Sequence, residues 1–196
     1  MNATIFNREP KTQTKNRIHP QKFALWIACA SIVMMFVGFT SAFVVRRAAG
    51  NWLEFDLPNL FFWNAGLIVL TSLVLHFSKV TFRNGDFTKY KSLLVIGALM
   101  GLGFVVLQYE AWIEMTNNGI FMTGNPAGSF VYVISGVHAA HVLGGLVALT
   151  AALIHAFSLK NFVTPQRIHR LDLTVTYWHF VGLLWLYLIF FLVLNS

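Results

Sequence analysis

The chain has 196 residues, of which 57% are hydrophobic and only 11% are charged. This composition excludes an ordinary soluble domain and is typical of a polytopic membrane protein. The single cysteine, Cys29, excludes an internal disulfide, a C-x-x-C-H haem attachment motif and a two-cysteine copper site.

Five apolar segments are long enough to span a bilayer, which takes about 20 residues. In chain order they cover approximately residues 23–45, 60–77, 92–114, 129–157 and 173–194. Residues 1–22 form a polar, basic segment, and the first apolar segment is too long for the core of a signal peptide. We therefore predict an all-α fold, with a five-helix membrane domain over residues 23–196 and no soluble catalytic domain.

The basic residues predict the orientation of this bundle. Five Lys or Arg residues precede the first span, four lie between spans two and three, and three lie between spans four and five. The opposite side holds only Arg46 and Arg47. This positive-inside pattern places the N-terminus in the cytoplasm and the C-terminus outside, and it explains the net charge of +7 without nucleic acid.

Small residues recur every four positions along span four and predict a close helix contact. The stripe consists of Gly136, Ala140, Gly144 and Ala148, and it continues to Ala152. His138 and His141 lie on an adjacent face of the same helix. We therefore expect the two imidazoles to lie beside the closest helix–helix contact and away from lipid.

A small set of polar residues lies within or next to the spans, where each needs a partner. The main members are Gln108, Glu110, His138, His141 and His179, with Asp172 just before span five. Three interpretations compete for this set: haem ligation, independent proton or ion transport, and interhelical hydrogen bonding that fixes the helices against one another and against a partner subunit.

Depth argues against haem, because His141 lies about twelve residues into span four and His179 only about six into span five. Transport is disfavoured because only Glu110 lies clearly inside a span and no paired, broken helices are present. The structural interpretation is therefore favoured from the residues alone.

Two long motifs resemble the signature helices of subunit III of cytochrome c oxidase, in the haem-copper oxidase family. They are GVHAAHVLGG at 136–145 and YWHFVGLLWLYLIFF at 177–191, and LQYEAW at 107–112 and TGNPAGSF at 123–130 add to the match. The resemblance runs in order from the first span to the C-terminus. It is to the short bacterial form, which lacks the first two of the seven spans of longer members.

The resemblance implies a subunit without catalytic residues, metal ligands or a cofactor of its own. Haem and copper are expected in subunits I and II of a proton-pumping terminal oxidase of the aa3 or caa3 type, which takes electrons from cytochrome c. The chain would pack on subunit I, next to subunit II and a small subunit IV. It would bind phospholipid and stabilise turnover and proton uptake in a bacterial plasma membrane.

The resemblance also assigns contact roles to individual residues. Interhelical, lipid or subunit I contacts are expected at His138, His141, His179, Trp178, Gln108 and Asp172, and Glu110 is close to a family acid at a different local spacing. Two positions depart from the family pattern. Ile32 stands where the family has a glutamate in a Ser-Glu-Val-Met motif, and Gly182 stands where it has an aspartate.

Two alternatives remain open. Within the family, the chain could be the equivalent subunit of a quinol oxidase, because other subunits determine the electron donor. From a different class of protein, it could be a free-standing membrane haem protein, which would show a haem absorption spectrum when isolated.

Overall fold

The computed structural model describes residues 19–159 and 162–195, which form five long helices and no strand. In chain order these are α1 (Pro20–Ala48), α2 (Asn59–Arg83), α3 (Phe87–Asn117), α4 (Pro126–Ser158) and α5 (Pro165–Asn195). Each is long and apolar enough to cross a membrane, which confirms the predicted number and order of spans. Most of the basic N-terminal segment, residues 1–18, lies outside the described residues.

The helices extend beyond the predicted apolar spans. Helix α2 continues past residue 77 to Arg83, and α5 begins at Pro165 rather than near residue 173. Hydropathy locates the hydrocarbon region, whereas the helical hydrogen bonds continue into the polar region on either side.

The helix starts follow from local chemistry. Pro20 and Pro126 occupy the first turns of α1 and α4, where a missing N–H group costs nothing. The Asn125 side chain accepts a hydrogen bond from the Ala127 N–H, and the Asp86 side chain accepts one from the Lys89 N–H at the start of α3. Gly85 supplies the positive φ of 80° that the tight turn between α2 and α3 requires.

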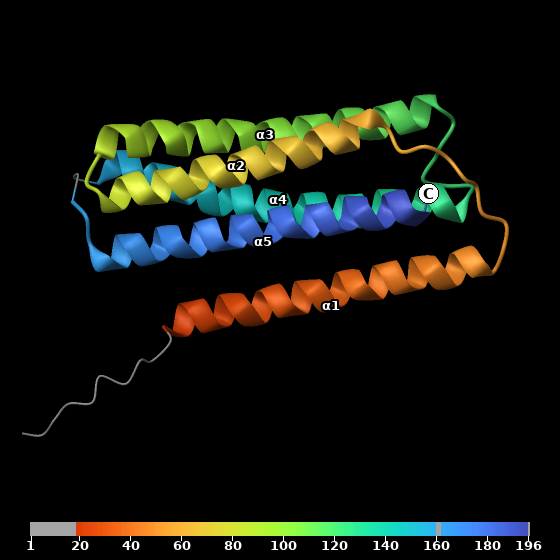
Figure 1. The fold of residues 1–196 in the computed structure, drawn as a ribbon, viewed down its shortest axis with the longest axis horizontal. Helices are drawn as coiled ribbons and strands as arrows, with labels where there is room; N and C mark the ends of the chain where they lie inside the picture. The colour runs from red at the N-terminus through yellow and green to blue at the C-terminus, as the bar shows by residue number, and fades with distance from the viewer. Residues whose placement is uncertain (1–18, 160–161, 196) are drawn as a thin grey trace, which may run out of the picture.

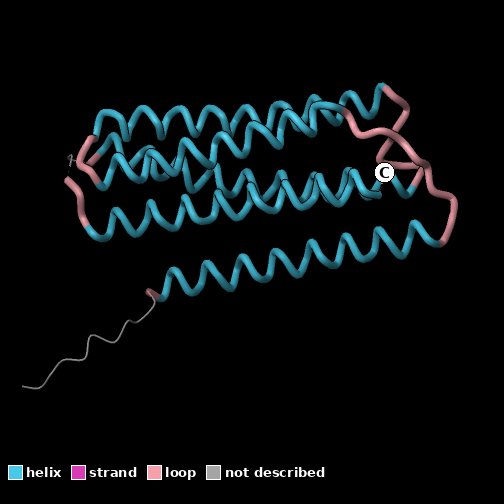
Figure 2. Tube along the Cα trace, viewed as in Figure 1, coloured by secondary structure: helices cyan, strands magenta, loops and turns pink. Residues whose placement is uncertain are grey.

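Helices α2 to α5 form a closed ring in which each helix packs against two others (Figures 1 and 2). The neighbouring pairs are α2 with α3, α3 with α4, α4 with α5, and α5 with α2. Within the described residues, α1 packs only against α4 and α5, and Figure 1 shows it along one edge of the ring.

Glycines that receive large side chains set the closest helix contacts in the ring. A Cβ atom added at Gly101 would lie 2.8 Å from Trp178 Cη2 and 2.9 Å from Leu146 Cδ2. At Gly145 it would lie 3.1 Å from the Trp178 ring, and at Gly97 2.6 Å from Leu75 Cδ2. Trp178, on α5, therefore fills the space left by two glycines on α3 and α4.

The predicted small-residue stripe does not make these contacts. Ala140 and Gly144 are exposed, and an added Cβ at Gly136 would come no closer than 4.0 Å to Trp112. The expectation that this stripe forms the closest contact of the bundle is wrong. Among the α4 glycines, the closest contact with another helix is at Gly145, one residue away from Gly144, because there the indole of Trp178 enters between the helices.

Candidate functional site

His138 lies in the centre of the ring and is completely buried. Its imidazole stacks on the Trp185 indole with ring centroids 4.7 Å apart, and Phe36 and Phe104 contact it edge-on at 6.3 and 5.9 Å. Neither ring nitrogen has a hydrogen-bond partner among the described residues. His138 therefore packs as one ring of an aromatic cluster that joins α1, α3, α4 and α5.

His141 is half-buried and faces in another direction. Its Nδ1 lies 2.8 Å from the Val137 carbonyl oxygen of its own helix, and its ring contacts Phe36 of α1 at 5.9 Å. The Tyr177 hydroxyl donates to the His141 carbonyl oxygen at 3.1 Å. The structure thus divides the predicted histidine pair: His138 belongs to the ring interior, and His141 lies where α1 covers the joint of α4 and α5.

Gln108 forms a buried hydrogen bond between α2 and α3, in which Asn64 Nδ2 donates to Gln108 Oε1 at 3.1 Å. Both side chains are buried. The sequence-based set included Gln108 and missed Asn64, although Asn64 is an amide within an otherwise apolar span. That isolated amide was the available signal.

Asp172 connects three helices at the end predicted to be cytoplasmic. Its carboxylate pairs with Lys79 of α2 and, at 3.4 Å, with Lys22 of α1. The side chains of Asp172 and Lys79 are each 18% exposed, so this is a partly buried ion pair rather than a freely solvated one. The sequence analysis selected Asp172 but neither lysine.

His179 and Glu110 are on outer parts of the bundle. The half-buried His179 ring lies 5.9 Å from the ring of His76 on α2. Glu110 is exposed on α3, and its carboxylate has no hydrogen bond or ion pair within the described ranges. The structure therefore does not bring the predicted polar residues together into one site.

Further polar contacts join α1 to α5 and α3 to α4. The Thr40 and Tyr187 hydroxyls lie 3.2 Å apart, and Trp112 Nε1 donates to Ser135 Oγ at 3.0 Å. The sequence-based set omitted these residues, because hydroxyl groups and tryptophans are common in spans and carry no distinguishing spacing.

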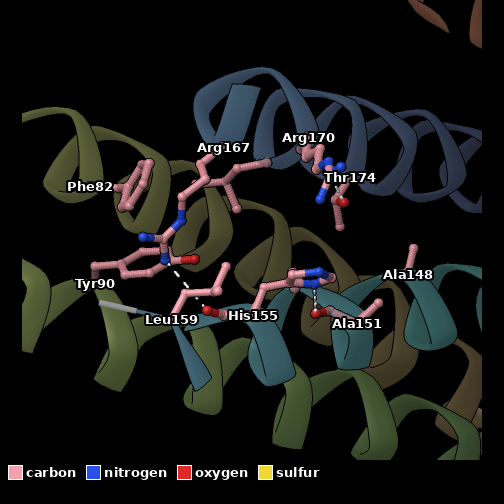
Figure 3. A pocket seen from close by; sticks show the side chains of 11 residues that line it. Phe82, Tyr90, Ala148, Ala151, His155, Leu159, Arg167, Arg170 and Thr174 are labelled. Atoms are coloured by element: carbon pink, nitrogen blue, oxygen red, sulfur yellow. Dashed lines mark hydrogen bonds between the residues drawn. The ribbon is translucent and has the colours of Figure 1, made fainter. Parts of the chain in front are cut away.

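A pocket opens at the predicted cytoplasmic end, between α4, α5 and the α2–α3 turn (Figure 3). Its cavity volume is about 140 Å³. Arg167 extends over the Phe82 ring at 5.4 Å and donates to the carbonyl oxygens of Phe162 and His155. Arg170 and Thr174 line the same pocket above an alanine-rich wall. The pocket is thus basic at its rim and apolar inside.

No group of three His, Cys, Asp or Glu side chains that could hold a metal ion occurs within the described residues. His138 and His141 point to different surroundings, and each is enclosed by rings or bonded to its own helix. What this arrangement supplies is a set of contacts between helices.

Comparison with known proteins gives the family. The family model for cytochrome c oxidase subunit III matches residues 51–195. The chain is 30% identical to the probable cytochrome c oxidase subunit 3 of Nocardia farcinica over 83% of this chain and 80% of that protein. It is 26% identical to the quinol oxidase subunit 3 of Bacillus subtilis over 81% of this chain and 78% of that protein. The chain therefore belongs to the cytochrome c oxidase subunit III family, as the two signature helices predicted.

Proposed function

We propose that this chain is the non-redox subunit III of a proton-pumping haem-copper oxidase, and that it packs on subunit I in a bacterial plasma membrane. The family match over residues 51–195 carries the proposal. Polar side chains that are buried or partly buried support it, because Gln108, Asn64 and Asp172 bond between helices and His138 is enclosed by aromatic rings.

The proposed electron donor to the complex is cytochrome c. In its favour, relatives at 30% identity carry the name probable cytochrome c oxidase subunit 3. The Bacillus subtilis relative, at 26% identity, favours quinol as the second candidate. Purification of the complex in mild detergent tests both electron donors. Oxidation of reduced cytochrome c, together with a copper-binding subunit II, would support cytochrome c. Oxidation of quinol alone would support quinol.

The haem and copper centres of the complex are proposed to reside in subunits I and II. The chain should therefore show no Soret absorption band when it is separated from those subunits. A band that persists through purification of the isolated chain would favour the free-standing haem protein instead.

Phospholipid is proposed to bind at the pocket of Figure 3, with its phosphate at Arg170 and Thr174 and an acyl chain against the alanine-rich wall. The pairing of basic rim and apolar wall supports this placement. Native mass spectrometry of the complex should show a retained phospholipid that Arg170→Ala reduces. The Arg46→Ala variant, which removes a half-buried arginine at the opposite end of the bundle, is the matched control and should leave the amount of retained phospholipid unchanged.

A further inference from the structure

A small group of titratable side chains joins the first turn of α1 to the ring, at the end predicted to be cytoplasmic. The rings of His19, at the start of α1, and His169, on α5, have centroids 4.0 Å apart. Lys22, three residues after His19, pairs with Asp172, three residues after His169. Asp172 also pairs with Lys79 of α2. We call these five residues the α1 clamp.

This half of α1 has few other attachments to the ring. Within the described residues α1 packs only against α4 and α5, and its buried side chains are Phe36, Thr40 and Phe43. No side chain of α1 before Phe36 is buried. The position of the first half of the helix therefore depends strongly on the α1 clamp.

His19 stabilises the start of α1 in its neutral form. It is the N-cap residue, and its Nδ1 accepts a hydrogen bond from the Gln21 backbone N–H at 3.4 Å. An imidazolium carries a proton on both nitrogens, so it cannot accept this bond. Its positive charge would also lie at the N-terminus of a helix, where the helix dipole opposes a cation. Protonation of His19 therefore removes the cap and adds a repulsion.

His169 also fits its place better as a neutral ring. Its Nε2 atom is buried and has no hydrogen-bond partner among the described residues. A charged imidazole donates from both nitrogens, and a buried N–H group without an acceptor is unfavourable. With ring centroids 4.0 Å apart, two charged imidazoles would also repel each other at contact distance.

The surrounding charges do not offset a further cation. Lys22 and Lys79 share the one carboxylate of Asp172, so the α1 clamp is already positive when both imidazoles are neutral. Arg83, four residues after Lys79 on α2, adds another cation at this end. The other titratable groups described at this end have different surroundings: Asp86 pairs with Lys89, His155, Arg167 and Arg170 line the pocket of Figure 3, and His76 contacts His179.

We infer that the α1 clamp is a pH-sensitive attachment, which fixes the start of α1 to α5 while His19 and His169 are neutral and releases it when they gain protons. Histidine side chains ordinarily change charge between pH 5 and 8. Because the attached arrangement favours the neutral rings, attachment is strongest above this range and weakens as the pH falls through it. Carboxylates ordinarily titrate near pH 4, so the Asp172 ion pairs persist there. The inference goes beyond the proposed function and does not depend on it, because every member of the clamp belongs to this chain.

The alkylation rate of Cys29 tests the inference in the full-length chain in lipid nanodiscs. Cys29 is half-buried on α1, ten residues after His19, and release of the helix should expose it. At each pH the wild-type rate is divided by the rate of the double variant His19→Asn/His169→Gln, which cancels the titration of the thiol itself. Asparagine is a good N-cap residue and keeps the cap without a titrating ring. We expect this ratio to rise roughly threefold or more between pH 8 and pH 5.5.

The change of the ratio with pH carries the test, so a variant that loosens α1 equally at every pH does not obscure it. The single variant His19→Asn, divided by the same double variant, should give a nearly constant ratio. His155→Gln removes an exposed histidine on α4 at the same end of the bundle and is the matched control, which should keep the full rise. A wild-type ratio that does not change with pH would overturn the inference, as would loss of the rise in His155→Gln.

Discussion

Helix α1 is at least as apolar as the helices of the α2–α5 ring, yet different contacts hold them in place. In the ring, Trp178 fills the space beside Gly101 and Gly145, and His138 stacks on Trp185. Helix α1 has only three buried residues, Phe36, Thr40 and Phe43. It depends on Phe36 near its middle and on polar bonds near both ends, such as Lys22 to Asp172 and Arg47 to Asn195 at 3.5 Å.

The difference shows what attaches a helix inside a membrane. Lipid tails are as apolar as leucine, so hydrophobicity brings a helix into the bilayer but does not fix it against a neighbour. Close packing fixes the ring, and a few specific side chains fix α1. Substitutions in the ring should therefore disrupt the whole bundle, whereas substitutions on α1 should release one helix.

The largest effect is expected from Gly101→Leu. The new side chain would overlap Trp178 and Leu146, and overpacking of this kind costs up to about 3 kcal/mol. We expect the variant to yield little folded protein. The folded fraction should have a Tm roughly 10 °C below that of the wild type, measured by tryptophan fluorescence in detergent. Gly144→Leu is the control, because Gly144 is exposed and its nearest neighbour is the Tyr177 hydroxyl at 3.7 Å. Equal damage from both variants would refute the assignment of the tight contact.

A smaller and more local effect is expected from Phe36→Ala on α1. Loss of the ring removes contacts to His138 and His141, and lipid can fill the space, so we expect about 2 kcal/mol rather than the ~3–5 kcal/mol of water-soluble cores. The alkylation rate of Cys29, the single cysteine, reports the position of α1 and should rise roughly 30-fold. The Tm of the ring should change little, and a collapse of the ring would show that α1 is part of its core.

Hydropathy and charge distribution allowed the five helices and their order to be predicted, because a span of about 20 apolar residues has few alternative structures. Packing could not be predicted in the same way. The stripe of Gly136, Ala140 and Gly144 has the same four-residue spacing as a contact face, but the contact lies at Gly145. The position of this contact is set by Trp178, which lies on α5, so it cannot be predicted from the residue pattern of α4.

The predicted polar residues had a mixed outcome for a related reason. Gln108 and Asp172 were recognised as polar groups in or near apolar segments, but their partners Asn64, Lys79 and Lys22 lie on other helices. Which side chains pair depends on the orientation of each helix about its own axis. A sequence predicts this orientation only when one face of the helix is clearly apolar and the other clearly polar. The expected contacts of His138, His141 and His179 with lipid or subunit I stay predictions.

A moderate effect is expected from Asp172→Asn, which removes the ion pairs to Lys22 and Lys79. Partly exposed pairs contribute about 1 kcal/mol, so Cys29 alkylation should accelerate roughly fivefold as the cytoplasmic end of α1 loosens. Glu54→Gln is the matched control, because Glu54 pairs with Arg47 at the opposite end and is 76% exposed. A similar rate in both variants would mean that Asp172 does not hold α1.

The smallest effect is expected from Asp86→Ala. This substitution removes the N-terminal cap of α3, which contacts neither α1 nor the interior of the ring. The carboxylate pairs with the Lys89 ammonium group and accepts a hydrogen bond from the Lys89 backbone N–H, and these contacts lower the pKa of Asp86 below its ordinary value of 3.8. A lowered pKa in the folded state means that the stabilisation is fully present above the ordinary value and is lost as the pH falls through the folded-state value. The wild type should therefore have a slightly higher Tm than the variant at pH 6, and the difference should shrink near pH 3. Asp56→Ala, an exposed acid without a capping role, should show neither change, and a difference that grows on acidification would contradict the cap.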